Sequence, residues 1–380
     1  MRRRALFVLI ATAGLLSPAA AATAAEKPIQ QKLDAIHAAG MPGAFAEVRD
    51  GRRVWTPTAG VADVKTGEPV RDGLRHRVGS ITKTFVATTM LQLAGERRVD
   101  LDAPVRRYLP YDIDRSVTVR MLLNHTSGIG DYDTEIIKTN DDIIAMGKRT
   151  YRPDELVRLG LAAPPTQGWS YSNTNYVLAG LIVEKVTGHS YRAEVSRRIL
   201  RPLGLRDTYF EGADPVIRGP HMHAYVPWPP DGELRDFTKY NMTWASSAGE
   251  MVSTAHDLNV FYRALLTGRL LPPHLLAEMQ TTVPEEGYGL GLYAVDLPCG
   301  RVWGHDGGTI GHLAISWHSP DARRQVTLAL NMAFYRTSPT EPHPIDVAVN
   351  DFLTTAMCGD QPAAKSATGF RWLGNQHSTY

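Results

Sequence analysis

The chain has 380 residues, of which 43% are hydrophobic and 21% are charged, and its formal net charge is +2. This balance is typical of a globular protein and excludes a largely disordered or fibrous chain. Lys and Arg are scattered along the sequence, so we expect no nucleic-acid partner. The length is sufficient for two sub-domains.

Residues 1–25 have the character of an export signal. Residues 1–4 are positively charged, residues 5–16 are apolar, and residues 20–25 offer small side chains for cleavage. The apolar run is shorter than the roughly 20 residues that a membrane helix needs. A cleaved signal is therefore favoured over an uncleaved anchor, and we expect a secreted protein with no stable membrane span.

The segment after the signal predicts one helix and a set of strands. Residues 28–39 have the apolar spacing of an amphipathic helix. Residues 44–49 and 53–56 flank Asp50-Gly51, which is the signature of a β-hairpin. A third short strand is expected over residues 59–64.

The middle of the chain is predicted to be mainly helical. Residues 84–94 are almost continuously apolar and predict a buried helix. The further helical or irregular segments are 101–108, 118–124, 154–161, 174–186, 191–199 and 255–266. The loops between them are rich in Pro, Gly and Asp, especially residues 227–232.

Strand character returns near the end of the chain. The predicted strands are 289–295, 302–304, 313–318 and 325–331, and a helix is predicted over 346–357. Strands at both chain ends favour an α/β fold in which an antiparallel sheet is flanked by the terminal helices and a helical sub-domain is inserted. We expect an α/β sub-domain from 26–80 and 285–358, a helical sub-domain from 81–284, and a tail from 359–380.

Ser80-Ile81-Thr82-Lys83 begins the predicted buried helix and is the only S-x-x-K sequence in the chain. Residues three apart lie on one helix face, so the Lys83 amine can reach the Ser80 hydroxyl. A serine needs a neighbouring base to attack an acyl carbon, and a desolvated lysine can provide it. The alternative is that Ser80 only caps the helix.

Two other short motifs have the side chains that such a nucleophile needs. Tyr171-Ser172-Asn173 precedes a helix, where the alternative is a packed tyrosine in a capping turn. His305 and Gly307 would lie on the same side of an extended segment, where the alternative is a surface turn. A glycine at 307 would allow a substrate to approach the backbone closely.

Other hydrolase and metal signatures are missing from the sequence. It contains no G-x-S-x-G and no H-E-x-x-H motif. His221 and His223 form a possible metal pair, but no third ligand has a recognisable spacing, so a loop pair without metal is favoured. We expect no metal and no cofactor.

The three motifs occur once each and in order, and together they resemble the serine penicillin-recognising family. This class C β-lactamase-like family includes D-alanyl-D-alanine carboxypeptidases, esterases and D-aminopeptidases, and the greatest resemblance is to the secreted soluble carboxypeptidases of actinomycetes. Similar stretches run from about residue 28 to residue 358. They are residues 78–83, 124–128, 171–176, 243–249 and 288–292.

The resemblance implies an acyl-enzyme mechanism with named roles. Ser80 would be the nucleophile, and Lys83 and Tyr171 would accept its proton and pass it to the leaving group. Asn173 would hold the acyl-side amide of the substrate. His305 stands where many relatives carry a lysine, and it would polarise Tyr171 or donate a hydrogen bond.

The resemblance also assigns residues around the substrate. The backbone N–H groups of Ser80 and Gly308 would form the oxyanion hole, and Gly307 would border the substrate. Trp244 would line the cleft, with a packed core residue as the alternative. The substrates would be small peptides or peptidoglycan stems, and β-lactams would inhibit the enzyme covalently. The protein would be a monomer.

One set of positions departs from the carboxypeptidase pattern. Where those relatives hold the terminal carboxylate with an arginine and two hydroxyl residues, this chain has Tyr293, Asp306 and Gly308. Loss of the bidentate cation disfavours an anionic leaving group. Thr309 could restore one hydroxyl. Arg75 or Arg77 could supply a cation, but a solvated pair of loop side chains is favoured for these two arginines.

Two lines of activity therefore stay open. The family resemblance favours a D-alanyl-D-alanine carboxypeptidase or transpeptidase. Asp306 could instead receive an ammonium group, which favours a D-aminopeptidase, D-amino-acid amidase or esterase. A β-lactamase and a non-catalytic penicillin binder are less favoured.

Cys299 and Cys358 are the only two cysteines in the chain. They follow the predicted signal, and a protein outside the cell can form disulfides. A structural disulfide is favoured over a nucleophilic or metal-binding thiol.

Overall fold

The computed structural model describes residues 26–229, 232–336, 338 and 341–359. The predicted signal and nearly all of the predicted tail lie outside these residues. Within them, no helix combines the length and apolar character needed to cross a bilayer.

An antiparallel sheet of eight strands is built from both ends of the chain. Its order is β10-β11-β12-β13-β1-β3-β4, and β2 pairs with β1. The strands are β1 (Gly43–Asp50), β2 (Arg53–Trp55), β3 (Thr58–Asp63), β4 (Glu68–Pro69), β10 (Tyr293–Leu297), β11 (Gly300–Gly308), β12 (Leu313–His318) and β13 (Arg324–Leu330). The pairing of Ala44 with Leu330 brings the first and last strands together at the centre of the sheet.

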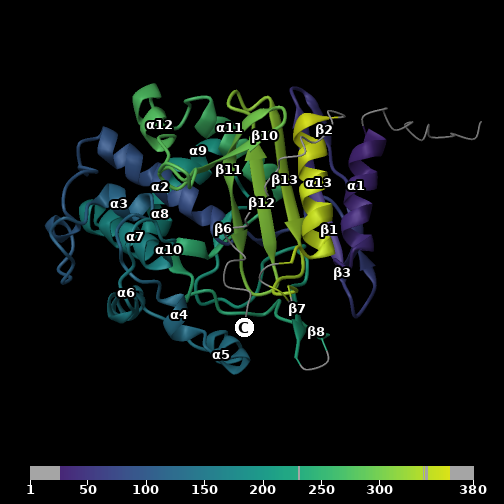
Figure 1. The fold of residues 1–380 in the computed structure, drawn as a ribbon, viewed down its shortest axis with the longest axis horizontal. Coiled ribbons are helices and arrows are strands. Elements are labelled where there is room, and N and C mark those ends of the chain that lie inside the picture. The colour runs from purple at the N-terminus through teal and green to yellow at the C-terminus, as the bar shows by residue number, and fades with distance from the viewer. Residues whose placement is uncertain (1–25, 230–231, 337, 339–340, 360–380) are drawn as a thin grey trace, which may run out of the picture.

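The two terminal helices cover one face of this sheet. Helices α1 (Glu26–Ala38) and α13 (Pro344–Cys358) lie side by side (Figure 1). Leu33 and Ile36, one turn apart, join Phe352 in a buried core with alternate residues of the strands. The prediction of an antiparallel sheet flanked by terminal helices is confirmed.

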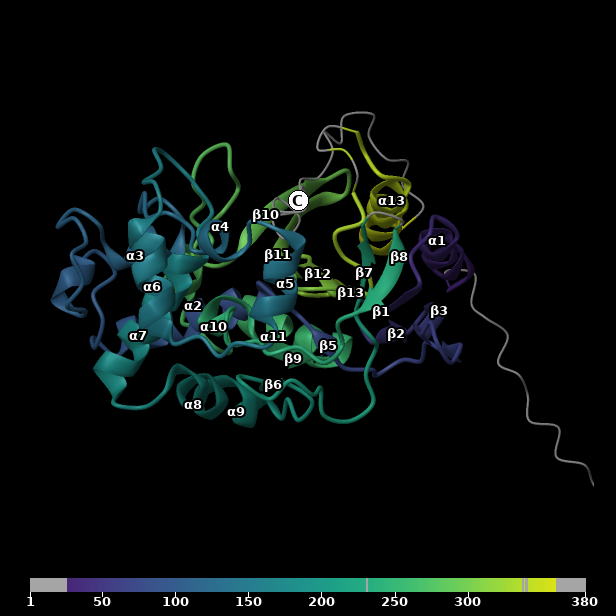
Figure 2. The same ribbon diagram turned by 90° about the horizontal axis from the view of Figure 1, so that it is seen from below.

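Helices from the middle of the chain cover the other face (Figure 2). The central one is α2 (Ile81–Gly95), which is buried nearly all round. The others are α3 (Val119–Leu123), α4 (Asp133–Ile136), α5 (Asn140–Met146), α6 (Pro153–Ala162), α7 (Asn173–Thr187), α8 (Tyr191–Val195), α9 (Arg201–Leu203), α10 (Ser246–Gly249), α11 (Ala255–Leu266) and α12 (Pro273–Met279), with single turns η1 (Val105–Arg107) and η2 (Ser196–Leu200).

The middle region also contains strands that the sequence did not predict. Strands β5 (His76–Arg77), β9 (Met251–Ser253) and β6 (Tyr209–Phe210) form a small sheet. Strands β7 (Tyr225–Trp228) and β8 (Glu233–Asp236) form a hairpin. The expected loop at 227–232 was therefore partly wrong, because an edge strand tolerates a proline such as Pro227.

Strand β10 begins later than expected. Residues 289–295 were predicted as a strand, but the strand starts at Tyr293. Gly291 has a φ of +72° and lies against Lys83 and Tyr176, so residues before Tyr293 turn instead of extending. An isolated β-bridge between Tyr288 and Tyr293 closes this turn.

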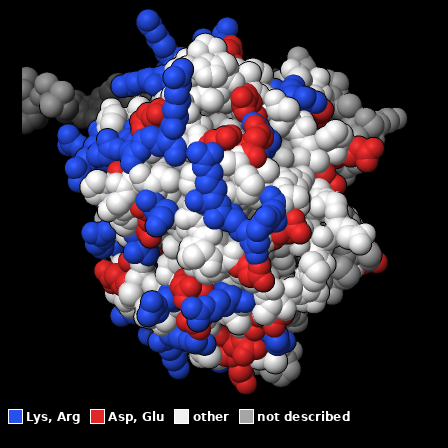
Figure 3. Space-filling model, turned by 90° about the vertical axis from the view of Figure 1, so that its left-hand side faces the viewer, with Lys and Arg blue, Asp and Glu red and all other residues white. Residues whose placement is uncertain are grey.

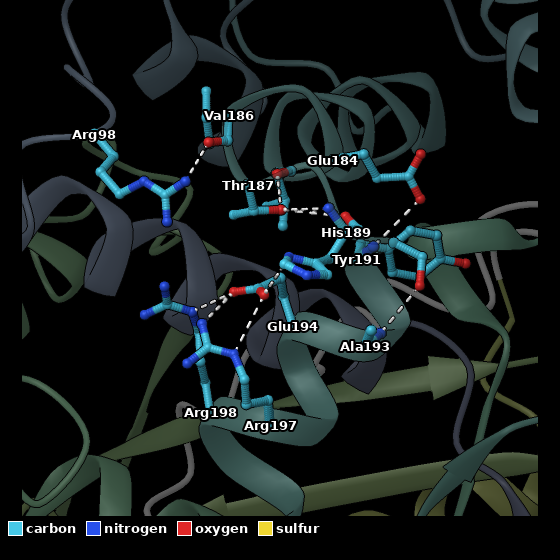
Figure 4. Close-up of polar contacts among 12 residues, drawn as sticks. Arg98, Glu184, Val186, Thr187, His189, Tyr191, Ala193, Glu194, Arg197 and Arg198 are labelled. Atoms are coloured by element: carbon cyan, nitrogen blue, oxygen red, sulfur yellow. Dashed lines mark hydrogen bonds and ion pairs between the residues drawn. The ribbon is translucent and has the colours of Figure 1, made fainter.

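An ion-pair cluster fastens the helices behind α2. Glu194 of α8 accepts hydrogen bonds from Arg197 (2.8 Å) and Arg198 (2.6 Å), as Figure 4 shows. Arg198 also bonds to Glu96, at the end of α2. Because Glu194 is almost fully buried, the cluster links α8 and η2 firmly to the helix that carries Ser80.

The outer surface of the helical side carries charges of both signs. Figure 3 shows Lys and Arg interspersed with Asp and Glu over this face. Opposite charges at such exposed positions contribute little stability as isolated pairs.

Candidate active site

Ser80 stands where strand β5 runs into helix α2. Its side chain makes no capping hydrogen bond, so the alternative of a pure helix cap is not observed. A Cβ at Gly79 would lie 2.6 Å from the Gly308 oxygen, and one at Gly307 would lie 2.6 Å from the Ser80 nitrogen. These glycines allow β11 to lie directly against the start of α2.

Lys83 connects the nucleophile to its surroundings. Its Nζ donates to Ser80 Oγ (2.9 Å), to Asn173 Oδ1 (2.7 Å) and to the Ala248 carbonyl (2.8 Å). The amide and carbonyl oxygens can only accept, whereas a hydroxyl can also donate. When Lys83 is neutral, the Ser80 hydroxyl can therefore donate its proton to the lysine nitrogen.

The environment of Lys83 favours this neutral form. The side chain is fully buried, and burial lowers the pKa of Lys83 to about 7. The carboxyl groups of Asp131, Asp133 and Asp306 oppose this shift without cancelling it. A lysine with this pKa can act as a base near neutral pH.

Tyr171 lies next to the lysine. Lys83 Nζ is 4.8 Å from the centre of its ring. Its hydroxyl is shielded from solvent and makes no well-formed hydrogen bond within the described part of the chain. Burial raises the pKa of Tyr171 well above its usual value, and the nearby Ser80 hydroxyl opposes the shift. The Tyr171 hydroxyl therefore stays protonated at rest.

Asn173 is the first residue of α7 and joins the lysine to two carboxyl groups. Its Oδ1 accepts from Lys83, and its Nδ2 donates to Asp133 (2.7 Å) and Asp131 (3.3 Å). The predicted role of Asn173 was to hold the substrate amide. In this structure both ends of its side-chain amide are engaged by protein groups.

His305 is turned away from the nucleophile. Its Nδ1 lies 2.5 Å from the Asp306 carbonyl, which can only accept, so Nδ1 carries the proton. Its Nε2 therefore accepts from the Tyr288 hydroxyl at 2.8 Å. Burial lowers the pKa of His305 to about 3. With both nitrogens engaged, the ring does not make the predicted hydrogen bond to Tyr171.

A cleft opens beside Ser80, with an empty volume of about 730 Å³. Five segments and the β11–β12 turn line it. The lining residues are Ser80, Tyr132, Asp133, Ile137, Tyr171, Asn173, Trp244, Ala245, Ala248, Gly249, Gly308, Thr309, Ile310, Leu313, Ala333 and Phe334. Most of the wall is apolar, so a ligand with a hydrophobic group fits it.

Four polar atoms of this lining have no hydrogen-bond partner among the described residues. They are Asp133 Oδ1, Tyr171 Oη, Trp244 Nε1 and Thr309 Oγ1. Buried polar groups are normally satisfied, and leaving one without a partner is costly. Their gathering in one cleft makes it the candidate site for a polar ligand.

The remaining predicted residues fall into two groups. Trp244 and Gly308 line the cleft, as the resemblance implied. Tyr293 and Asp306 are buried beside one another and are not part of the lining, and the Asp306 carboxyl contributes to the raised pKa of Tyr293. The expectation that Asp306 receives a substrate group thus has no support from its position.

Arg75 and Arg77, the two arginines considered for carboxylate binding, both form ion pairs within the protein. Arg77 is buried in an ion pair with Glu211, at 2.7 Å. Arg75 forms an ion pair with Asp207. Neither side chain borders the cleft, whose described lining contains no Lys or Arg. The cleft therefore has no cation placed to hold a substrate carboxylate.

Sequence reasoning missed the acidic segment of the cleft. Asp131 and Asp133 follow the 124–128 stretch closely, and two acids near a recognised motif were the available signal. Burial, followed by the neighbouring Asp131, raises the pKa of Asp133 well above its usual value. Phe334 was also missed, because it reaches the cleft from beyond β13.

The cysteines and histidines outside the cleft have structural positions. Cys299 and Cys358 are bonded, with Cα atoms 5.3 Å apart, so the end of α13 is tied to the β10–β11 turn. His223 lies 2.9 Å from Asp236, and His221 bonds to the Gly219 carbonyl. Within the described residues, no three metal-binding side chains gather.

Comparison with known proteins supports the geometric description. A family model described as Beta-lactamase matches residues 26–347. A D-stereospecific amidohydrolase from Streptomyces sp. has 40% identity and a TM-score of 0.79, and the match covers 88% of this chain and 99% of that one. A D-amino acid amidase from Ochrobactrum anthropi SV3 has 28% identity and a TM-score of 0.75, over 87% and 98% of the two chains.

A further relative matches over a shorter stretch. Esterase EstB from Burkholderia gladioli is 36% identical over 189 residues, which are 46% of this chain and 48% of the esterase. The match thus spans about half the length of that relative.

Proposed function

The chain belongs to the beta-lactamase family of active-site serine hydrolases, and from this premise we propose that it hydrolyses amides of D-amino acids whose α-amino group is free. The acyl group would be carried by Ser80. The acyl side chain would be hydrophobic, and the leaving group would be ammonia or an amine.

The observation that carries the proposal is the carboxyl group of Asp133. It lines the cleft, it is only 7% exposed, and its Oδ1 has no hydrogen-bond partner among the described residues. Burial raises the pKa of the Asp133 carboxyl, and a cation bound beside it would favour its charged form. An α-ammonium group would supply both the charge and the missing hydrogen bond.

The position of Asp133 fits a group next to the reacting carbonyl. Asn173 bonds to Asp133 on one side and to Lys83 on the other, and Lys83 bonds to Ser80. The ammonium site and the nucleophile are therefore joined by three successive hydrogen bonds. In an α-amino amide, one carbon atom separates the ammonium nitrogen from the carbonyl carbon.

The apolar wall supports a hydrophobic acyl side chain. Ile137, Ile310, Leu313 and Phe334 line the cleft together with the Trp244 ring. Burying an aromatic or branched side chain there stabilises the complex by roughly 1.5–3 kcal/mol. The D configuration is supported by the relatives, a D-stereospecific amidohydrolase and a D-amino acid amidase.

The proposed reaction begins with neutral Lys83. It takes the Ser80 hydroxyl proton as Oγ bonds to the carbonyl carbon. The backbone N–H groups of Ser80 and Gly308 stabilise the oxyanion, and losing one such donor costs about 3 kcal/mol.

The acyl-enzyme then forms and breaks down. Tyr171 gives its proton to the leaving nitrogen as the C–N bond breaks, and Lys83 returns a proton to Tyr171. A water molecule gives a proton to the same base and bonds to the acyl carbon, and Ser80 recovers its proton. The products are a D-amino acid and ammonia or an amine.

The carboxypeptidase alternative has less support. A terminal carboxylate would enter a cleft whose described lining has no Lys or Arg and does contain Asp133. A substrate anion would further favour the protonated form of the buried Asp133 carboxyl, and it would find no cation in the described lining. We therefore place release of D-alanine from D-alanyl-D-alanine below amide hydrolysis.

The test compares three substrates: D-phenylalanine amide, its N-acetyl derivative and a D-alanyl-D-alanine peptide. We expect turnover of the first, with kcat/KM about 10- to 100-fold lower after acetylation, the equivalent of about 1.4–2.8 kcal/mol. Asp133→Asn should remove most of this difference. Rapid D-alanine release without amide hydrolysis would reject the proposal.

Other features of the sequence extend the proposal. The composition of residues 1–25 supports export, and a compartment outside the cell permits the Cys299–Cys358 bond. The family resemblance supports acylation of Ser80 by β-lactams. We expect the mature protein to act as a monomer.

A further inference from the structure

We propose that His125 is a positioning residue that holds Tyr171 in place for proton transfer to the leaving group. The inference rests on the serine-hydrolase mechanism and on the role of Tyr171 in it. It does not depend on which acyl group the enzyme prefers.

His125 holds the backbone on both sides of Tyr171. The backbone N–H of Ser170 donates to the His125 carbonyl at 3.0 Å. The backbone N–H of Ser172 donates to His125 Nδ1 at 3.2 Å. The residues before and after Tyr171 are thus both fixed to one histidine.

The imidazole ring also packs on the phenol itself. The two ring centres lie 4.2 Å apart with 32° between the planes. Since the Tyr171 hydroxyl has no well-formed hydrogen bond in the described structure, contacts of this kind and the backbone set its position. A displacement of even 1 Å in a reacting group can cost about 100-fold in rate.

His125 must be neutral to do this. A backbone N–H can only donate, so Nδ1 accepts and the ring proton is on Nε2. The ring is fully buried, and burial, together with the nearby Lys83, lowers the pKa of His125 well below its usual value. The acceptor that Ser172 needs is therefore present throughout the working pH range.

The backbone of His125 is unusual as well. Its φ is +64°, in the left-handed region that few residues other than Gly and Asn adopt readily. It directly follows Asn124, which ends helix α3. Termination of α3 would account for the conformation, but Gly or Asn would do this with less strain. Helix termination leaves the contacts of the ring unexplained.

Two substitutions each remove one of the two kinds of side-chain contact that His125 makes. His125→Asn keeps a short acceptor and tolerates the left-handed backbone, but it removes the ring. His125→Phe keeps a ring but removes the acceptor. His318→Asn is the matched control, because His318 of β12 is equally buried and stacks on Tyr262 of α11, with ring centres 4.4 Å apart.

The informative measurement is the ratio of amide to ester hydrolysis. An anilide leaving group needs the proton from Tyr171, whereas p-nitrophenolate leaves without it. For D-phenylalanine p-nitroanilide we expect kcat to fall about 10- to 100-fold in both His125 variants with KM nearly unchanged, which is the usual size of a lost proton-transfer contribution. Hydrolysis of p-nitrophenyl acetate should fall less than about threefold.

The controls keep folding and mechanism apart. The ester burst counts active sites, so every kcat refers to folded enzyme. Tyr171→Phe should give the same selective loss, and His125→Phe should add little to it. Equal loss of both activities in the His125 variants, or the same selective loss in His318→Asn, would overturn the proposal.

The proposed function is judged separately. If the wild type does not cleave the anilide, the substrate proposal fails, and the second-order rate of Ser80 acylation by benzylpenicillin replaces the anilide rate. The β-lactam nitrogen also needs a proton on ring opening. A selective loss with benzylpenicillin relative to the ester would support the role of His125, and no selective loss would reject it.

Discussion

Lys83 and Arg77 are two buried cations six positions apart in the sequence, and their surroundings differ in kind. Lys83 Nζ contacts a hydroxyl, an amide oxygen and a carbonyl, all neutral. The carboxyl groups of Asp131 and Asp133 are linked to it only through the Asn173 amide. Burial without a direct counter-ion is what lowers the pKa of Lys83 to about 7.

Arg77 has the opposite environment. Its Nε and Nη2 bond to both carboxylate oxygens of Glu211, at 2.7 and 3.2 Å. Its guanidinium also donates to the carbonyl groups of Phe237, Thr238 and Tyr240. A planar guanidinium suits such multiple acceptors. Arg77 thus fastens the 211–240 segment behind strand β5.

The residues 77–83 therefore contain one buried cation that stabilises the fold and one that can take part in proton transfer. A buried cation with a direct ion pair stabilises one arrangement of the fold, and it remains charged. A buried cation with only neutral acceptors is easily deprotonated, and it can serve as a base. Substitutions at Lys83 should therefore lower activity, and substitutions at Arg77 or its partner Glu211 should lower stability.

The largest expected effect is on catalysis at Lys83. Lys83→Met removes the base, and Lys83→Arg replaces it with a group that does not deprotonate. Both should lower kcat about 10³- to 10⁴-fold, at the upper end of general-base contributions. Steady-state kinetics and a melting curve check this. Retention of more than a tenth of the activity in Lys83→Arg would show that no proton leaves this site.

The next effect is on stability at Arg77. Glu211→Gln or Arg77→Met leaves a buried charge without its partner, and we expect a loss of about 3–5 kcal/mol in the free energy of unfolding. Urea denaturation measures this loss. The kcat of the remaining folded enzyme should change only a few-fold, and an unchanged unfolding curve would contradict the structural role.

The third effect concerns the pH dependence of the reaction. The base form of Lys83 is present above its pKa of about 7 and is lost as pH falls. The rate constant kcat/KM should therefore rise about tenfold per pH unit below 7. It should fall again above about pH 8, where the α-ammonium group of the free substrate loses its proton. A flat profile between pH 5 and 8 would mean that Lys83 does not act as the base.

The smallest expected effect is a change in the pKa of Lys83 when the charge of Asp133 is removed. The Asp133 carboxyl raises the pKa of Lys83, so Asp133→Asn should move the acid limb of the profile to lower pH. We expect a shift of about 0.3–1 pH unit, because the charge lies one side chain away. A shift to higher pH would reverse the sign of the proposed coupling.

Local spacing explains which parts of the site were predictable. Ser80 and Lys83 lie one helical turn apart, so their contact follows from the helix alone. Tyr171 and Asn173 flank a helix start and could be recognised as a motif. The sheet was predictable for the same reason, since alternating residues in 313–318 and 325–331 mark strands.

Contacts between distant segments were not predictable in this way. The pairing of Arg77 with Glu211 joins positions 134 residues apart. His305 was recognised, but the sequence did not reveal that Tyr288 would take its free nitrogen. Asp133 was overlooked because its place beside Ser80 depends on a cleft that six separate segments form.

The central claim is that Ser80 is the residue acylated during turnover, and trapping the acyl-enzyme tests it most directly. The enzyme is mixed briefly with the p-nitrophenyl ester of D-phenylalanine, quenched in acid and mapped by peptide mass spectrometry. We expect one phenylalanyl group on the peptide containing Ser80. The yield of this modified peptide should be much smaller in Lys83→Met and zero in Ser80→Ala. A modification at another residue, such as Ser172 or Ser247, or an undiminished yield in Ser80→Ala, would contradict the claim.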